Sequence, residues 1–341
     1  MTSGLNNDFV ARLIAFGPHD GAHRVAVRAC VSIVVPLLVV QATGHAPWTI
    51  YAAFGAFTSL YGRERVDRSR LLLQAEAGLV QVACVVLGVL VGTSDQRAWL
   101  AVPIAAIVAT LAAARSSFAG WHPPGSLFQI FAFASVASVP SHLGDVGTGA
   151  AVAGASAAFA VLVGAVGSLQ RRVRGYGVVS MNRPIGGALE GVWPYALQAG
   201  VGVLVAGAIA TGVGIGRPYW AMVAAVVPLA ARNLTAQLVR GLHRIVGTGL
   251  GLLVAWALLA LDIRGIALVA VIAVLQAAAE LLVGRNYALA LVWVTPLALL
   301  MVHAAAPVPT DQLLADRGLE TLIGAVIGIV IGYLTRPRLR F

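Results

Sequence analysis

Lysine is absent from this sequence, and charge of either sign is scarce. All 23 basic residues are arginine, there are 13 acidic residues, and charged residues make up 11% of the 341-residue chain. Soluble domains are about 25% charged, so the composition excludes a soluble globular protein. The missing lysine also excludes a P-loop, because that motif needs a phosphate-binding lysine. We therefore expect no ATP-binding site and no cofactor.

Cysteine is nearly absent as well. Cys30 and Cys84 both lie inside apolar runs, without the spacing of a disulfide framework or a metal site. We interpret them as small buried hydrophobic side chains and expect no metal.

Long apolar runs take up most of the chain, which is 59% hydrophobic with a mean hydropathy of +0.89. A membrane-spanning helix needs about 20 apolar residues, so the runs predict an all-α integral membrane protein with about twelve transmembrane helices. The first six are expected at residues 25–43, 47–62, 70–93, 98–114, 124–140 and 147–169, and the second six at 193–213, 218–232, 241–261, 265–283, 287–304 and 318–335.

The sequence contains an internal repeat. Residues 45–79 and 217–251 align without a gap at an offset of 172, which places Trp48 on Trp220 and Arg68 on Arg240. Six helices per copy is an even number, so both copies cross the membrane in the same direction. We expect two parallel six-helix repeats related by a pseudo-twofold axis along the membrane normal.

Arginine placement predicts the orientation, because cytoplasmic loops carry the excess of Lys and Arg. With both termini in the cytoplasm, 19 of the 23 arginines lie on the inner side. The four outer ones are Arg97, Arg217, Arg264 and Arg317. The N-terminus lacks the pattern of a cleaved signal peptide, and residues 8–16 fit a short amphipathic surface helix.

This topology leaves no room for a sizeable soluble domain. The basic linker between the repeats is interpreted as a cytoplasmic connector, whose charge suits orientation and contact with anionic membrane lipids. Nucleic acid is not expected as a partner, because no soluble basic face remains to bind it. Homo-oligomerisation is left open. The expected segments are an N-terminal cytoplasmic segment at 1–24, the first repeat at 25–169, the linker at 170–192, the second repeat at 193–335 and a cytoplasmic tail at 336–341.

Four motifs of the second repeat carry a family resemblance. They are YWAMVAAVV from Tyr219, RGLHRIVGTGLG from Arg240, RNYALALVWVTPLALLM from Arg285 and RGLETLIGAVIG from Arg317. They resemble the fusaric acid resistance and aromatic acid exporter superfamily, to which the plant aluminium-activated malate transporters are distantly similar. The first repeat matches more weakly, with GSLFQIFAFASV where the second has YALALVWVTPLA.

The resemblance implies a multi-pass protein of the bacterial inner membrane that exports organic anions, with aromatic carboxylates as the usual class. It does not fix the substrate. Many such exporters carry large cytosolic portions that have no counterpart here, so no role of those portions carries over.

A basic cluster lies where the third helix of the second repeat enters from the cytoplasm. Arg240, His243 and Arg244 are spaced i, i+3 and i+4 and so share one helical face. Two interpretations are open, a positive-inside anchor and a site that captures the carboxylate of the substrate. Arg244 lies one turn deeper than Arg240, which favours capture there.

Arg28 and Glu76 are expected inside their helices, where an ionised group costs at least about 2.5 to 3.5 kcal/mol. Mutual pairing is the simpler hypothesis. The sharper hypothesis makes Glu76 the residue that couples proton movement to transport, since burial and a nearby arginine shift a carboxyl pKa in opposite directions.

Several aromatic and polar residues are further candidates for the substrate path. Trp48, Tyr51, Tyr219 and Trp220 begin the second helix of each repeat, either as an aromatic belt or, for Trp220 above all, as a face for an aromatic substrate. Asn286, Tyr287 and Thr295 project polar atoms from an apolar helix that contains Pro296, and either line the path or bond to a neighbouring helix. Arg317 either pairs with Glu320 or contacts the anion at the exit.

Glycines at regular spacing predict close helix packing. Gly324, Gly328 and Gly332 form one ridge, and Gly247 and Gly251 belong to a second cluster.

A secondary transporter, with proton coupling as an option, is the leading hypothesis for function. A passive organic-anion channel is the alternative in mechanism. A membrane-embedded enzyme would need a clustered catalytic set, and His303 and Asp311 have no nucleophile or metal ligands beside them in the sequence. A permease subunit driven by a separate ATPase would need longer cytoplasmic loops. We expect no enzymatic activity.

Overall fold

The fold is seen in a computed structural model that describes residues 9–19, 21–63, 65, 67–173, 191–231 and 233–335. Within these ranges every regular element is helical. Most of the expected linker and the whole of the expected tail, residues 174–190 and 336–341, lie outside the described residues, as does Arg232.

The elements divide into an N-terminal half, α2 to α7, and a C-terminal half, α8 to α13. The N-terminal half consists of α2 (Ala22–Ala42), η1 (Ala46–Trp48), α3 (Thr49–Ala56), η2 (Phe57–Leu60), α4 (Asp67–Gly92), α5 (Arg97–Ala119), α6 (Leu127–Ala137) and α7 (Asp145–Val173). The C-terminal half consists of α8 (Val192–Gly212), α9 (Tyr219–Leu229), α10 (Leu234–Ala260), α11 (Gly265–Leu282), α12 (Tyr287–Ala305) and α13 (Thr310–Leu334). Residues 9–14 form a further short helix before α2.

Eight of the described helices are long and apolar enough to cross a membrane. The chain is therefore a multi-pass membrane protein. The eight are α2, α4, α5, α7, α8, α10, α11 and α12. Every expected span coincides with a helical segment, but α3, α6 and α9 have only 8, 11 and 11 residues, short of the roughly 20 that a span needs.

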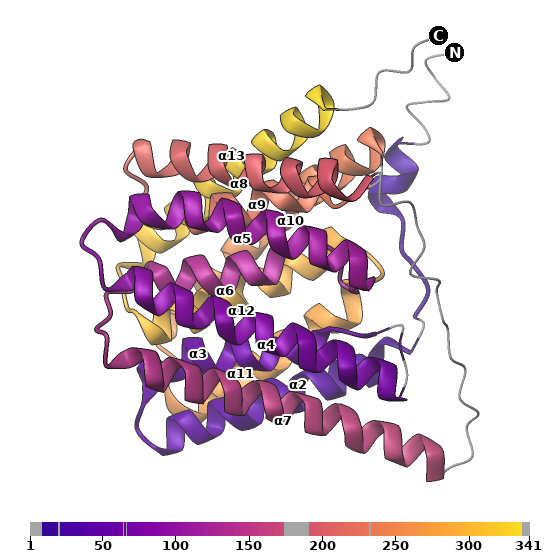
Figure 1. Cartoon of the computed structure of the whole chain (residues 1–341), viewed down its shortest axis with the longest axis vertical. Coiled ribbons are helices and arrows are strands. Elements are labelled where there is room, and N and C mark those ends of the chain that lie inside the picture. Colours follow the sequence, from indigo (N-terminus) through magenta and orange to yellow (C-terminus); the bar gives the residue numbers. More distant parts are fainter. Residues whose placement is uncertain are drawn as a thin grey trace.

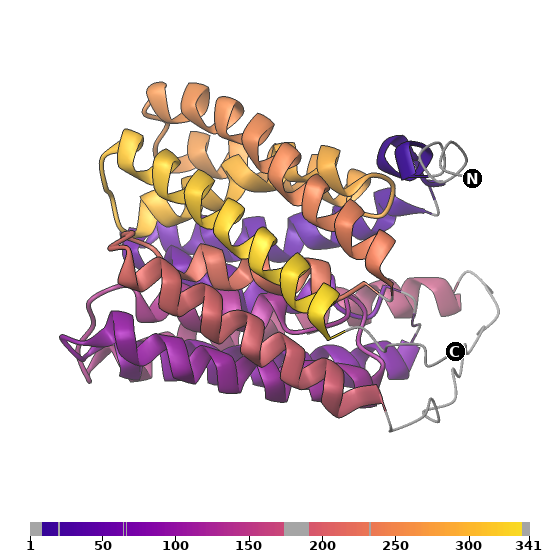
Figure 2. The same ribbon diagram turned by 90° about the horizontal axis from the view of Figure 1, so that it is seen from above.

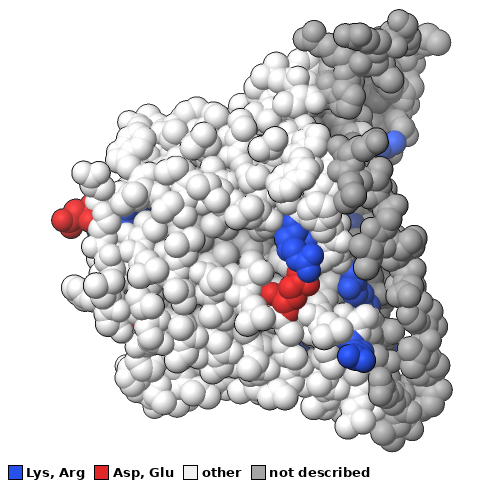
Figure 3. Space-filling view, viewed as in Figure 1, with Lys and Arg blue, Asp and Glu red and all other residues white. Residues whose placement is uncertain are grey.

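The short helices lie in the interior. All eight residues of α3 and all eleven of α9 are buried, as expected for helices that are apolar all round. The long helices surround them and expose Leu79, Leu162, Trp256 and Val274 at their surface, where lipid rather than water is the natural contact. Figure 3 shows one side of this surface, on which charged side chains are few.

The long helices run side by side along one direction (Figure 1). The start of α2 and the end of α13 lie at the same end of the bundle (Figures 1 and 2). We call this end, at which α2, α4 and α12 begin and α11 ends, the basic end. The two halves contact each other through long helices: α2 packs against α11, and α5 packs against α8.

Glycine lets two helix pairs of the C-terminal half approach closely, as the sequence predicts. A Cβ atom at Gly324 would overlap the carbonyl oxygen of Ala221, which lies on α9. A Cβ atom at Gly247 would overlap the carbonyl oxygen of Ala288, on α12. These contacts hold α13 against α9 and α10 against α12, and so position the helices that line the central cavity.

Candidate functional site

A cavity of about 600 Å³ lies between the two halves, within the range of roughly 300 to 1,000 Å³ that is usual for ligand pockets. The N-terminal half contributes α3, η2, α6 and the loop before α6, and the C-terminal half contributes α9 to α13. Along α12 the lining runs from Tyr287 to Val302. At 1.5 Å per residue the cavity is therefore about 22 Å deep, measured from the basic end.

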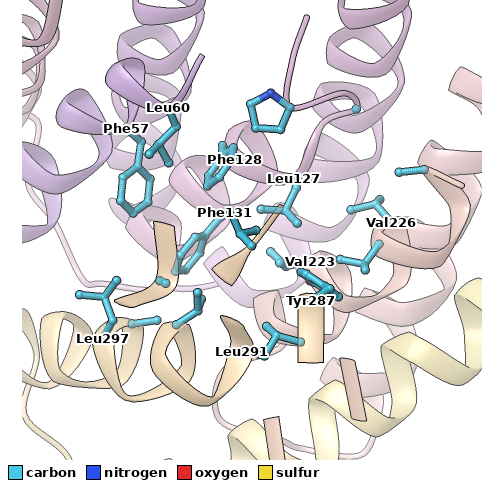
Figure 4. Close-up of a pocket in the computed structure, with 18 of the residues that line it drawn as sticks. Phe57, Leu60, Leu127, Phe128, Phe131, Val223, Val226, Tyr287, Leu291 and Leu297 are labelled. Carbon is cyan, nitrogen blue, oxygen red and sulfur yellow. The ribbon is translucent and has the colours of Figure 1, made fainter. Parts of the chain in front are cut away.

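The N-terminal half supplies an aromatic wall. Phe54 and Phe131 meet edge to face with ring centroids 5.0 Å apart, and Phe57 meets Phe128 in the same way at 5.5 Å. Figure 4 shows Phe57, Phe128 and Phe131 next to one another at the cavity. Phe131 also lies 4.7 Å from the ring of Trp220 on α9, which extends the wall into the other half. Such rings offer flat apolar surface to an aromatic ligand.

The C-terminal half supplies arginines at increasing depth. Arg240 and Arg244 line the cavity from α10 and Arg317 lines it from α13. Arg244 is 3% exposed and donates a hydrogen bond of 3.1 Å to the Tyr287 hydroxyl. Arg317 is 1% exposed, and its guanidinium lies 3.8 Å from the centre of the Trp220 ring. This geometry is a cation–π contact.

Several buried hydrogen-bond donors of Arg244, Arg317 and Trp220 have no acceptor within the described structure. In the described structure no partner is found for Nε of Arg244, for Nε and Nη1 of Arg317, or for Nε1 of Trp220, although all four atoms are buried. A buried charge without a counter-charge is strongly destabilising. Arg317 and Glu320, which the sequence suggests as a pair, lie close enough for their charges to interact, and the Glu320 carboxylate also accepts a bond of 3.2 Å from the backbone N–H of Arg217. An anion in the cavity would satisfy these donors.

An ion pair between the halves lines the same cavity. Arg63, in the loop after η2, pairs with Glu280 on the last turn of α11. Gln276, one turn earlier on α11, donates a 3.0 Å hydrogen bond to the other carboxylate oxygen of Glu280. The sequence suggests only that Glu280 ends a helix, and gives no sign that Arg63 lies against it.

Five of the sequence candidates line the cavity. They are Trp220, Arg240, Arg244, Tyr287 and Arg317. All five come from the C-terminal half, where the motifs of the family resemblance lie.

Five other candidates lie outside the cavity lining. Trp48 stacks on His45 with ring centroids 3.8 Å apart, and Arg28 donates to the carbonyl of Ser59 at 3.4 Å. The remaining three are buried in helix contacts, and they are Tyr51, Tyr219 and Thr295.

His243 and Asn286 bind the chain itself. Nε2 of His243 lies 2.9 Å from the carbonyl oxygen of Leu13, and Nδ2 of Asn286 donates to the carbonyl of Ala15 at 3.1 Å. The guanidinium of Arg285 lies 4.0 Å from the centre of the Phe16 ring. Residues 13–17, which we call the N-terminal arm, are thus fastened across α10 and the start of α12. The side-chain oxygen Oδ1 of Asn286 meanwhile caps α12 by accepting a hydrogen bond from the backbone N–H of Leu289.

Glu76 also lies outside the cavity lining. Its carboxylate pairs with Arg115 on α5 at 2.6 Å, and the two side chains are 30% and 52% exposed. Its partner is therefore Arg115, where the sequence suggested Arg28.

Sequence reasoning missed the aromatic wall and the Arg63–Glu280 pair. The aromatic wall does have a signal in the sequence. Phe54 and Phe57 are three residues apart, as are Phe128 and Phe131, and this spacing places each pair on one helical face. The Arg63–Glu280 ion pair joins residues 217 positions apart, and no local sequence pattern indicates such a contact.

Comparison with known proteins finds similarity to a protein family and to one curated bacterial protein. Residues 186–331 match the family described as fusaric acid resistance protein-like. The uncharacterized membrane protein YvaC of Bacillus subtilis (strain 168) is 30% identical over 138 residues, which are 40% of this chain and 22% of that protein. The match thus spans about a fifth of the relative's length. No solved structure matches the chain.

The family match covers α8 to α12 and nearly all of α13, the helices that bring Trp220, Arg244 and Arg317 to the cavity. The C-terminal half of the chain is thus similar to the fusaric acid resistance protein-like family.

Proposed function

We propose that the protein is a secondary transporter that exports organic anions, aromatic carboxylates in particular, across the bacterial inner membrane. One observation carries the proposal: Arg244 and Arg317, buried and with donors left over, share a cavity with a wall of aromatic rings. The arginines suit a carboxylate, and the rings suit a flat apolar body. The family name, which refers to resistance to an acid, agrees with export.

The arginines of the cavity lie in an order that suits a path for an anion across the membrane. Arg240 and Arg244 lie one turn apart on α10, and Arg317 lies on α13, which begins at the end opposite the basic end. A carboxylate entering from the basic end would meet Arg240, then Arg244, and then Arg317 above the Trp220 ring. Stepwise donors allow an anion to move without crossing a stretch that lacks a counter-charge.

We further propose the two-repeat architecture, with helices α2–α7 and α8–α13 as parallel repeats about an axis along the membrane normal and both termini in the cytoplasm. Three matched packings support it. The first helix of each half packs against the fourth helix of the other, as α2 against α11 and α8 against α5. Within each half, the second helix packs against the sixth, as α3 against α7 and α9 against α13. The third packs against the fifth, as α4 against α6 and α10 against α12.

Exchange in proteoliposomes tests the transport proposal. Purified full-length protein is reconstituted in vesicles loaded with unlabelled 4-hydroxybenzoate, and uptake of the labelled compound is followed at pH 7.5, where the acid is ionised. Uptake above that of protein-free vesicles is expected, with less for cyclohexanecarboxylate because it lacks the aromatic face. No uptake of any aromatic carboxylate would refute the proposal.

A second measurement separates a coupled transporter from the passive channel. We expect saturable exchange that is stimulated by unlabelled substrate on the far side of the membrane. A current whose reversal potential follows the anion gradient alone would support the channel.

A further inference from the structure

Glu280 is the single carboxylate among the described residues that line the cavity. Its side chain is 6% exposed. Both oxygens are engaged, one by Arg63 and the other by Nε2 of Gln276 at 3.0 Å. The carboxylate is therefore held inside the cavity by one counter-charge and one neutral donor.

Arg63 reaches Glu280 from the opposite half of the molecule. Its side chain is 18% exposed and also lines the cavity. Its buried Nε has no partner in the described structure. Arg63 is therefore positioned to bind either Glu280 or a carboxylate that enters the cavity.

Other charged or titratable groups near Glu280 are mostly cations. Helix α2 packs against α11 and brings Arg28 and Cys30 near the carboxylate. Helix α12 also packs against α11 and contributes Tyr287 to the cavity. The remaining charged or titratable groups of the lining are Arg240, Arg244 and Arg317 on α10 and α13, and Tyr61 and His122 of the N-terminal half.

We propose that Glu280 takes up a proton when an organic anion binds, so that the anion and one proton occupy the cavity together. The inference rests on the proposed anion transport. An entering carboxylate competes with Glu280 for Arg63, and a buried carboxylate that loses its counter-charge is destabilised in its charged form. A proton from water at the basic end moves to a Glu280 oxygen. The anion replaces Glu280 as the counter-charge of Arg63, so the net charge of the cavity stays constant.

The sign of the coupling follows from this exchange. Binding of anion and proton favour one another, so anion affinity rises as the pH falls through the titration of Glu280. At the limit of one proton per anion, the dissociation constant changes about tenfold per pH unit.

The alternative carboxylate, Glu76, is separate from this exchange. It pairs with Arg115 and is not among the cavity-lining residues. The two acids therefore form a matched pair of test positions in one protein.

Calorimetry of benzoate binding tests the inference with the full-length protein in detergent. Titrations in two buffers with different ionisation enthalpies count the protons taken up per benzoate. We expect up to about one proton for the parent and for Glu76→Gln, and less than about 0.2 for Glu280→Gln. Glu280→Asp keeps a carboxyl group and is expected to restore the uptake. Benzenesulfonate, which stays ionised, should give the parent's value and so exclude the ligand as the titrating group.

Two results would overturn the assignment. One is the same proton uptake in Glu280→Gln as in the parent, and the other is its loss in Glu76→Gln alone. Gel filtration and the parent-like behaviour of Glu280→Asp distinguish loss of the proton site from loss of folding. If the parent bound neither benzoate nor benzenesulfonate at any pH, the proposed function would fail instead, and this inference with it.

Discussion

The two halves of the molecule contribute different chemistry to one cavity. The N-terminal half provides most of the rings, among them Phe57 and Phe131, and the C-terminal half provides three of the four lining arginines, Arg240, Arg244 and Arg317. The sequence alignment at an offset of 172 places Leu72 at the position of Arg244. Leu72 is 60% exposed on the outer surface, whereas Arg244 is buried against the cavity. Similar helices have thus diverged into a hydrophobic side and a cationic side, as an amphipathic ligand requires.

One aligned pair shows why the same residue type has different surroundings. Trp48 stacks on His45 at the end of the bundle, whereas Trp220 lies under the guanidinium of Arg317. Trp220 contacts a residue of the cavity because α13, far along the chain, brings Arg317 over its ring. What surrounds a residue, and not its position in the repeat, decides whether it contacts the path.

The largest effect should come from the arginines that the C-terminal half brings to the cavity. Arg317→Ala is expected to reduce exchange of labelled 4-hydroxybenzoate about 10- to 100-fold, because a hydrogen bond to a charged group contributes about 1.5 to 3 kcal/mol. Arg264→Ala is the matched control, since Arg264 pairs with Asp262 and is 81% exposed. Equal exchange by both variants would contradict the cationic role of Arg317.

Helix packing gives the next contrast. Gly324→Ala forces a Cβ atom against the Ala221 carbonyl, and should lower the free energy of unfolding by about 1 to 3 kcal/mol. Gly154→Ala on α7 meets open space and should leave stability unchanged or raise it, because alanine is the better helix former. Thermal unfolding in detergent measures both. A Gly324→Ala protein as stable as the parent would show that α9 and α13 are not in tight contact.

The aligned tryptophans should differ more modestly. Trp220→Phe keeps a ring under Arg317 but weakens the cation–π contact, which is worth about 0.5 to 2 kcal/mol. A roughly 2- to 30-fold loss of exchange is expected, against less than about twofold for Trp48→Phe. The same initial-rate assay compares them, and an equal loss at both positions would place Trp48 on the path too.

The smallest effect concerns the N-terminal arm. His243→Leu removes the bond to the Leu13 carbonyl, which at about 1 kcal/mol corresponds to roughly fivefold faster local opening. Hydrogen exchange at Gly17, whose N–H donates to the Arg285 carbonyl at 2.9 Å, reports that opening. His142→Leu, in the exposed loop between α6 and α7 of the other half, is the control. Unchanged exchange at Gly17 in both variants would show that the arm does not depend on His243.

Helix positions were predictable because they follow from local hydropathy. Each expected span overlaps a helix of the structure, and the glycine ridges pack as expected. Helix lengths were harder to predict, since residues 124–140 are mostly apolar but α6 occupies only Leu127–Ala137. Buried short helices have the same composition as spanning ones, because both avoid water.

Side-chain partners were predictable only in part. Arg240 and Arg244 share a helical face, and that face does line the cavity. His243, on the same face by spacing, instead binds a carbonyl of the arm 230 positions away. Glu76 likewise has a partner, Arg115, that lies on the next helix.

By itself, the sequence determined that this protein enters the membrane as helices, where those helices lie, and which family its C-terminal half resembles, because apolar run lengths and local motifs are contained in consecutive residues. Only the tertiary structure decided which charges meet. The contacts between Arg317 and Trp220 and between Arg63 and Glu280 join residues 97 and 217 positions apart. In a medium without water, each buried charge is stabilised by whatever neighbour the helix packing brings to it.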